Sequence, residues 1–148
     1  MIGISSRPKT LMLLCGILIF SCYEKPEEYA LIATEKGDTS FPMKPQKILW
    51  DVRQIMGPDD ILISDVGAHK MWISRYYQCR EPNTCLISNG FCTMGFAMPG
   101  SLGAKMAFPE KNILSISGDA GFMMNVQELE TAVRRKLNVV AMVWIDGE

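Results

Sequence analysis

The residues best suited to chemistry lie near the end of the chain, in the glycine-containing segment 118–122, which has the sequence Gly-Asp-Ala-Gly-Phe. The apolar residues 113–117 before it predict a short buried strand, and the apolar spacing in residues 122–137 predicts a helix. A turn at such a junction presents unpaired N–H groups to an anion, and its two glycines allow a close backbone approach. Asp119 would repel a bare phosphate, so the segment best fits a phosphate bridged to the carboxylate by a divalent cation such as Mg²⁺.

The same segment has a simpler interpretation that involves no ligand. Asp119 lies close to the start of the predicted helix, and an aspartate in such a place commonly caps the helix by accepting hydrogen bonds from backbone N–H groups. Many α/β proteins contain a turn of this kind. The segment by itself leaves open whether Asp119 is a metal ligand or a cap.

Predicted strands alternate with predicted helices in the second half of the chain. Strands are expected at residues 61–64, 84–87, 113–117 and 139–145, and helices at residues 46–56, 68–78, 95–108 and 122–137. This alternation predicts an α/β fold with a parallel sheet, right-handed crossovers and helices on both faces. Ligands of such sheets bind beyond the carboxyl ends of the strands.

Each predicted strand is followed by a polar segment that contains glycine. These segments are residues 65–69, 89–95, 118–121 and 146–148. Because the carboxyl ends of parallel strands meet at one edge of a sheet, the four segments are expected to lie close together there. One glycine turn is weak evidence for a site, but four converging turns predict a shared binding site.

Several segments resemble the thiamine-diphosphate-dependent enzymes, and among these most closely the acetolactate synthases. Residues 64–77, 88–105 and 118–133 are similar to successive segments of that family's carboxyl-terminal cofactor-binding domain, and the similarity extends from about Pro42 to Glu148. The resemblance implies a partial thiamine-diphosphate-binding fold. It also implies an enzyme that decarboxylates pyruvate and joins the product to a second 2-oxo acid, as in branched-chain amino acid biosynthesis.

The resemblance implies a set of Mg²⁺ ligands. The family motif is Gly-Asp-Gly or Gly-Asp-Ala, followed after a helix and a strand by a second Asn or Asp, and it matches Asp119 and Asp146. The backbone carbonyl of Glu148 matches a third ligand. In the family, the metal ion holds the two phosphates of the cofactor.

The resemblance also implies which residues contact thiamine diphosphate. The matching positions are Gly67, Ala68, His69, Cys92, Met94, Gly118, Ala120 and Gly121. The Met94 side chain matches an apolar wedge that bends the cofactor and so brings its amino group to the thiazolium carbon. Taken alone, His69 also fits a capping or partly buried histidine, and Met94 also fits core packing. Many relatives carry Gly or Gln at Cys92, so only its main chain is expected to act.

Composition argues against several other functions. The chain has 148 residues, of which 48% are apolar, and a net charge of −1 with mixed signs. It can therefore bury one core, and it lacks the basic balance typical of nucleic-acid binding. Its five cysteines include no Cys-x-x-Cys pair and it has one histidine, so neither a disulfide framework nor a zinc site is indicated. We expect reduced thiols in a cytoplasmic protein.

Residues 1–44 differ in character from the rest. Residues 1–22 contain basic residues and then an apolar run, as in a secretory signal or a lipoprotein signal ending at Cys22, although the run is too short to span a bilayer. The competing interpretations are a buried helix and an unrelated remnant joined to the cofactor domain. Residues 23–44 are polar and rich in turn formers, which predicts a linker. Residues 45–148 then form the cofactor-binding domain.

Two features of the resembled family have no counterpart here. Nothing in residues 1–44 resembles its pyrimidine-binding domain, whose glutamate activates the cofactor, and Glu148 coincides with the last metal ligand, so we interpret the domain as carboxyl-terminally truncated. A homo-oligomer or a partner chain is expected to supply the missing domain. Because an open site admits water, this chain alone is expected to bind the cofactor weakly and to turn over little substrate.

Three hypotheses about function remain open at this point. The first is an acetolactate-synthase-like enzyme acting on 2-oxo acids such as pyruvate, or a related decarboxylase or oxalyl or glyoxylate carboligase. A second is a module that binds thiamine diphosphate and Mg²⁺ without catalysis. The third is an exported or lipid-anchored protein whose α/β domain has an unrelated task.

Overall fold

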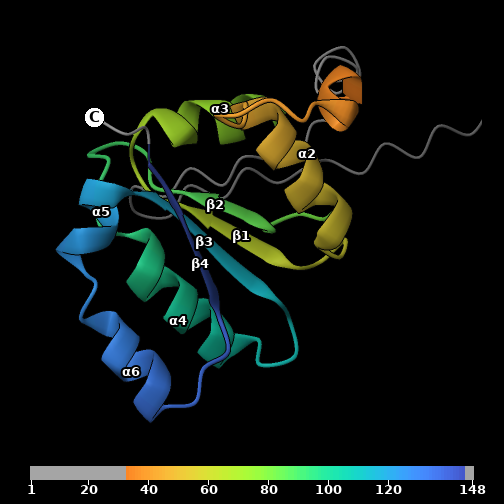
Figure 1. Cartoon of the computed structure of the whole chain (residues 1–148). Helices are drawn as coiled ribbons and strands as arrows, with labels where there is room; N and C mark the ends of the chain where they lie inside the picture. Colours follow the sequence, from red (N-terminus) through yellow and green to blue (C-terminus); the bar gives the residue numbers. More distant parts are fainter. Residues whose placement is uncertain (1–32, 146–148) are drawn as a thin grey trace, which may run out of the picture.

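The computed structural model describes residues 33–145, which contain one sheet of four parallel strands (Figure 1). The strands are β1 (Ile61–Ser64), β2 (Cys85–Ile87), β3 (Ile113–Gly118) and β4 (Val140–Trp144), and they lie in the order β2-β1-β3-β4. Every neighbouring pair runs parallel. The α/β fold predicted from the sequence is confirmed.

Helices cover both faces of the sheet. They are the 3-10 helix η1 (Thr34–Gly37) and the α-helices α2 (Pro45–Ile55), α3 (Ala68–Tyr76), α4 (Ala97–Ala107), α5 (Asp119–Met124) and α6 (Glu128–Arg134). In Figure 1, α2 and α3 lie on one face, and α4 and α6 lie on the other. Because α3 joins β1 to β2 and α4 joins β2 to β3, these two crossovers pass over opposite faces of the sheet.

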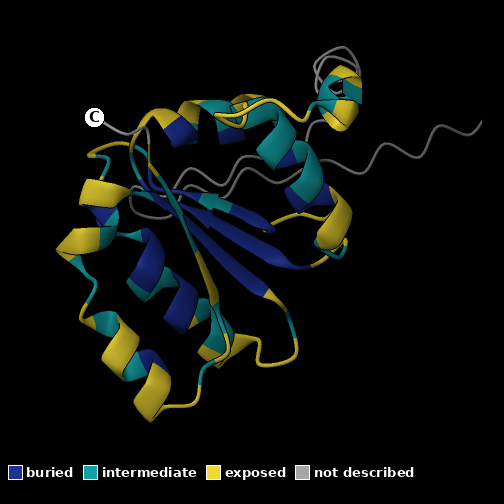
Figure 2. Cartoon of the chain, in the orientation of Figure 1, coloured by how far each residue is buried: buried dark blue, intermediate teal, exposed yellow. Residues whose placement is uncertain are grey.

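The central strands are apolar at most positions because both of their faces are covered. On one face, Leu62 and Ile116 belong to the core that α2 and α3 complete. On the other face, Ile63 and Ile113 pack with residues of α4. Figure 2 shows the resulting pattern, in which the sheet interior is buried and the outer sides of the helices are exposed.

A buried carboxylate holds the amino end of β1. Asp60 is 6% exposed, and its Oδ2 accepts hydrogen bonds from the Gly57 N–H (2.7 Å) and from Asn112 Nδ2 (3.0 Å). Its Oδ1 accepts a third bond from the Asn112 N–H at 2.9 Å. Asp60 therefore joins the turn before β1 to the residue before β3, at the edge of the sheet opposite the predicted site.

The prediction of one continuous helix at residues 122–137 is wrong in two respects. The segment forms two short helices, α5 and α6, and α5 already begins at Asp119. Asn125 leaves the helical conformation (φ −134°, ψ 29°), and its Nδ2 donates to the Gly95 carbonyl at 2.8 Å. Asparagine competes with helix hydrogen bonds through its own amide group, and here a distant residue supplies the acceptor. The other predicted elements are present, with ends that differ from the prediction by at most two residues.

The predicted leader at residues 1–22 and the first part of the predicted linker lie outside the described residues. From residue 33 onward the chain forms η1, which lies against α2. Lys44 Nζ forms ion pairs with Glu35 (3.0 Å) and Asp38 (2.8 Å) and so ties η1 to the start of α2. In the described part of the chain, no helix is long and apolar enough to cross a membrane.

Candidate functional site

The sheet reverses its direction of growth between β1 and β3. The chain passes from β1 through α3 to β2 on one side, and then returns through α4 to β3 on the other side of β1. Neighbouring connections diverge at such a switch point, which is where open α/β sheets usually bind ligands. Three of the four predicted site segments, 65–69, 89–95 and 118–121, follow β1, β2 and β3 at this edge.

Asp65 lies at the centre of this edge and is fully buried. Its Oδ1 accepts hydrogen bonds from the backbone N–H groups of Val66 (2.7 Å) and Gly95 (2.9 Å), and its Oδ2 accepts one from the N–H of Ala97 (3.1 Å). Asp65 was part of a predicted site segment but had no predicted role. The available signal was a carboxylate directly after a short strand with three apolar residues, where an ionisable group is rarely buried without partners.

Gly67 brings the backbone against the ring of His69. Gly67 has a φ of 155°, and a Cβ atom at this position would lie 2.7 Å from His69 Cε1. A Cβ atom on Gly118 would lie 3.7 Å from the same carbon. The imidazole ring therefore lies between the segments that follow β1 and β3, so the structure brings Gly67, His69 and Gly118 together as predicted.

His69 is buried but incompletely hydrogen-bonded. The side chain is 4% exposed, and among the described residues nothing partners its Nε2 atom. Burial lowers the pKa of His69 below its ordinary value, although the backbone and the charge of Asp65 act in the opposite direction. The Trp144 ring lies 6.2 Å from the imidazole centroid to centroid, and its buried Nε1 also has no partner in the described part of the chain. Two buried ring nitrogens, His69 Nε2 and Trp144 Nε1, thus have no hydrogen-bond partner among residues 33–145.

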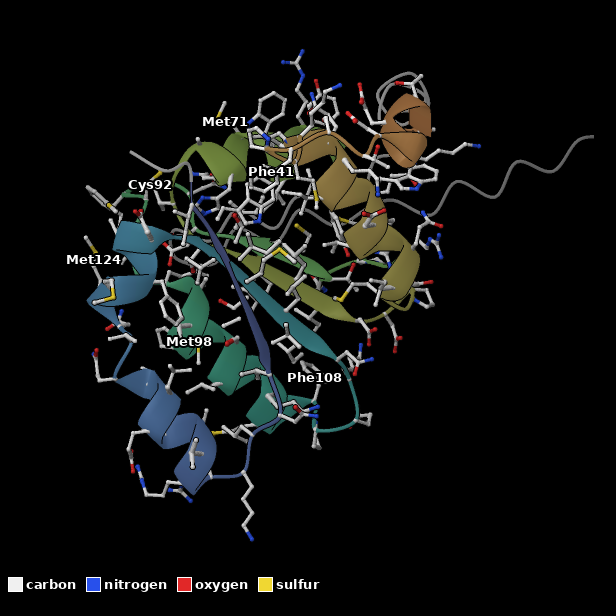
Figure 3. All side chains as sticks on the ribbon, in the orientation of Figure 1. Phe41, Met71, Cys92, Met98, Phe108 and Met124 are labelled. Carbon is white, nitrogen blue, oxygen red and sulfur yellow. The ribbon has the colours of Figure 1, made fainter. Side chains whose placement is uncertain are left out.

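The loop between β2 and α4 carries Cys92 and Met94 at the same edge. Cys92 adopts a left-handed backbone conformation (φ 49°), and Lys70 Nζ lies 3.2 Å from its Sγ and donates to the Ser88 carbonyl at 2.9 Å. The Met94 side chain is 40% exposed, so it does not belong to the hydrophobic core that the described residues form. Figure 3 labels Cys92 at the end of the molecule near α5, whereas Phe108 lies at the opposite end.

Gly95 and Asn125 connect this loop to α5. Gly95 has a φ of 78°, and a Cβ atom there would lie 2.6 Å from Asn125 Nδ2. The amide of Asn125 instead donates to the Gly95 carbonyl, and the Gly95 N–H donates to Asp65. Neither contact was predicted, because the partners are distant in sequence and meet only after the helix breaks at Asn125.

Residues 118–121 form the junction between β3 and α5. Asp119 and Ala120 are exposed, and Asp119 Oδ1 accepts a hydrogen bond from the Ala120 N–H at 2.6 Å. Gly121 is buried, and a Cβ atom there would lie 3.3 Å from Asp65 Cγ. One oxygen of Asp119 thus bonds the N–H of the next residue, which is not a side-chain cap of α5, and the carboxylate as a whole remains open to solvent.

Only one of the three predicted metal ligands can be located. Asp119 is described, whereas Asp146 and Glu148 lie outside the described residues. Within residues 33–145, no three His, Cys, Asp or Glu side chains lie close enough together to hold a metal ion. The residues present nevertheless fit a metal-bound diphosphate chemically, because an exposed carboxylate and a buried, unpartnered imidazole nitrogen flank the same glycine-containing junction.

The fold and the position of these segments define a class, namely α/β proteins with a ligand site at the switch point of a parallel sheet. Residues 65–148 match the family described as thiamine pyrophosphate enzyme, C-terminal TPP binding domain. Thiamine pyrophosphate is another name for thiamine diphosphate. Since the match covers more than half of the chain, the chain belongs to the thiamine pyrophosphate enzyme family.

Its relatives include several acetolactate synthases. The chain is 40% identical over 112 residues to acetolactate synthase of Bacillus subtilis, covering 76% of this chain and 19% of that protein. It is 36% identical over 121 residues to acetolactate synthase isozyme 3 large subunit of Escherichia coli, covering 81% and 21%. It is 38% identical over 109 residues to a probable acetolactate synthase large subunit of Methanocaldococcus jannaschii, covering 70% and 18%.

These comparisons confirm the resemblance inferred from the sequence motifs. The chain contains the thiamine-diphosphate-binding carboxyl-terminal domain of acetolactate-synthase-like proteins. It spans about a fifth of the length of the curated relatives that it matches.

Proposed function

We propose that the switch-point edge of this sheet, together with residues 146–148, binds thiamine diphosphate and Mg²⁺ for an acetolactate-synthase-like reaction. In that reaction pyruvate loses carbon dioxide, and the remaining two-carbon unit is joined to a second 2-oxo acid. The observation that carries the proposal is that the family match begins at Asp65 and spans every segment at this edge. When bound, the cofactor supplies an electron sink for the charge left by decarboxylation.

The diphosphate is assigned to the junction around His69. A phosphate oxygen would accept a hydrogen bond from the buried Nε2 atom when that nitrogen carries a proton, and the negative charge of a phosphate favours the protonated imidazole that burial alone disfavours. Beside this ring lie Gly67 and Gly118, and Ala68 begins α3, the helix that carries His69. Gly121 lies in α5. Their main chains, with that of Ala120, are the proposed diphosphate contacts.

Mg²⁺ is assigned to Asp119, Asp146 and the backbone carbonyl of Glu148. Carboxylate and carbonyl oxygens are the ligands that Mg²⁺ prefers, and the ion keeps some water while it binds phosphate oxygens. Asp119 is exposed, and its Oδ1 already accepts the Ala120 N–H. Because a carboxylate has two oxygens, this local hydrogen bond to Oδ1 and metal binding by Oδ2 are compatible.

The organic part of the cofactor is assigned to the loop before α4. Cys92 contributes its main chain, whose left-handed conformation turns the loop, and Met94 contributes both its main chain and a partly exposed apolar side chain. An apolar side chain in contact with the cofactor would restrict its conformation and exclude water from it. We assign these residues to binding and orientation only.

The proposal extends to partners and location. Substrates are 2-oxo acids such as pyruvate, and a pyrimidine-binding domain with its glutamate, as in the resembled family, completes the site. The chain spans about a fifth of the length of the acetolactate synthases that it matches. A cytoplasmic location is supported by five cysteines without a disulfide pattern.

Calorimetric titration of the purified chain with thiamine diphosphate, with and without Mg²⁺, tests the proposal. We expect binding that requires Mg²⁺ and that is lost in Asp119→Ala and in Asp146→Ala. Asp59→Ala is the matched control, because Asp59 is an exposed carboxylate that pairs with Lys111 (3.6 Å) near the opposite edge of the sheet. Metal-independent binding, or no binding, would refute the assignment.

A second assay addresses catalysis. Acetolactate formation from pyruvate is expected to be very low with the chain alone, and to rise when a separately expressed pyrimidine-binding domain of an acetolactate synthase is added. Consumption of oxalyl or glyoxylate substrates in preference to pyruvate would redirect the proposal to those carboligases.

A further inference from the structure

We infer that Asp65 is the positioning residue of the proposed cofactor site, which holds three separate segments in one arrangement before any ligand binds. This inference rests on the proposed function, since the segments in question carry the proposed cofactor contacts. Nothing in the family match or in the names of the relatives assigns a role to Asp65.

The first argument is the number and source of its hydrogen bonds. The three donors of Asp65 are backbone N–H groups, one from its own segment (Val66, 2.7 Å) and two from the loop and helix start after β2 (Gly95, 2.9 Å; Ala97, 3.1 Å). A buried backbone N–H needs an acceptor, and these three face a fully buried carboxylate. The carboxylate therefore fixes the loop of Cys92 and Met94 to the end of β1.

The second argument is the contact of Asp65 with α5. A Cβ atom on Gly121 would lie 3.3 Å from Asp65 Cγ and 3.4 Å from Oδ1, so glycine allows the start of α5 to pack directly on the carboxylate. The backbone N–H of Asp65 also donates to the Ile116 carbonyl of β3 at 2.8 Å. Asp65 thus touches all three segments that carry the described cofactor contacts.

Asparagine at this position would break the arrangement with almost no change in shape. Asparagine has one acceptor oxygen and one NH₂ donor group. If its oxygen takes the place of Oδ1, the NH₂ group faces the N–H of Ala97; if its oxygen takes the place of Oδ2, the NH₂ group faces Val66 and Gly95. At least one buried N–H then faces another donor in either orientation, so the loop is expected to shift away.

Asp60 provides a matched control at the other end of the same strand. It too is a buried aspartate with three hydrogen bonds, from Gly57 and Asn112, but it lies at the amino end of β1, away from the proposed site. Asp60→Asn and Asp65→Asn should therefore lower the stability of the fold in a similar way. Only Asp65→Asn should also change the site.

The experiment measures thiamine diphosphate affinity in the presence of Mg²⁺ for the full chain and both variants, corrected for the folded fraction found by urea unfolding. We expect Asp65→Asn to weaken binding by roughly tenfold or more and Asp60→Asn to change it by less than about twofold. Equal effects of the two substitutions would overturn the inference, because Asp65 would then act only through stability.

Amide hydrogen exchange in the ligand-free protein tests the inference without relying on binding or on the folding of a variant. The N–H groups of Gly95 and Ala97 are expected to be protected in the wild-type chain, and Asp65→Asn to expose them more than Asp60→Asn does. Exchange at unprotected rates in the wild type would overturn the positioning role. If the wild type fails to bind thiamine diphosphate, the proposed function is refuted, whereas the exchange rates still decide whether Asp65 holds this loop.

Discussion

Replacing Gly67 by alanine is expected to unfold the candidate site and to lower the stability of the whole domain. Gly67 combines a positive φ of 155° with a direct contact to His69, where an added Cβ would lie 2.7 Å from Cε1 and 2.8 Å from Nδ1. Real Cβ contacts are not this short. The backbone or the imidazole ring must therefore move in Gly67→Ala.

The magnitude follows from these two effects. A non-glycine residue held in a sparsely populated backbone region costs of order 1–3 kcal/mol. His69 is 4% exposed, so its ring has little room to turn, and an off-rotamer side chain costs roughly 0.5–1.5 kcal/mol more. Gly67→Ala should therefore lower the free energy of unfolding by about 2–4 kcal/mol, a large part of the total for a domain of this size.

Urea unfolding monitored by circular dichroism measures this effect, and Gly103→Ala is the control. Gly103 lies in α4 with no atom within 4 Å of an added Cβ, so alanine there should raise the free energy of unfolding by about 1 kcal/mol through helix propensity. The reasoning is refuted if Gly67→Ala unfolds within about 0.5 kcal/mol of the wild type.

Three further predictions concern neighbouring contacts. In Gly95→Ala, the added Cβ would lie 2.6 Å from Asn125 Nδ2, so the free energy of unfolding should fall by about 2–4 kcal/mol and thiamine diphosphate should bind more weakly. An unchanged midpoint of urea unfolding together with an unchanged calorimetric affinity would contradict this. Tyr77→Phe removes the hydroxyl that accepts a hydrogen bond from the buried Arg53 Nη1 atom (2.9 Å). The free energy of unfolding measured in urea should fall by about 1–3 kcal/mol, whereas Tyr76→Phe should change it little. Burial lowers the pKa of His69 below its ordinary 6.5, so the unfolded chain takes up this proton first, and the stability should be full above about pH 6.5 and fall as the pH drops toward the folded pKa. Because His69 is the only histidine, His69→Gln should flatten this part of the pH profile, and a profile that stays unchanged would contradict the cause.

Much of the fold was predictable because local patterns and the burial of the sheet agree. The four strands, including the fully buried β1, coincide with short apolar runs that contain β-branched residues. The helices between them have lengths typical of parallel crossovers. The break at Asn125 was not predictable. Its cause is the hydrogen bond to Gly95, whose strength depends on a contact across 30 residues of sequence.

The candidate site was predictable in its place but not in its organisation. The segments after β1, β2 and β3 were expected at one edge, and Gly67, His69 and Gly118 lie together there. The roles of all these site residues stay predictions, and Asp146 and Glu148 lie outside the described part of the chain. Asp65 was overlooked, since an aspartate after a strand is as typical of a turn as of a buried acceptor.

The amino-acid sequence by itself determined the class of fold, the edge of the sheet that carries the site and the family motif around Asp119, because these depend on short-range periodicity and on residue types at fixed spacing. Only the tertiary structure decided that Asp119 already lies in a helix, that one nitrogen of the buried His69 has no partner within residues 33–145, and that three segments meet on the carboxylate of Asp65. These features depend on which backbone groups come within hydrogen-bonding distance once the strands have paired, and no local pattern encodes that distance.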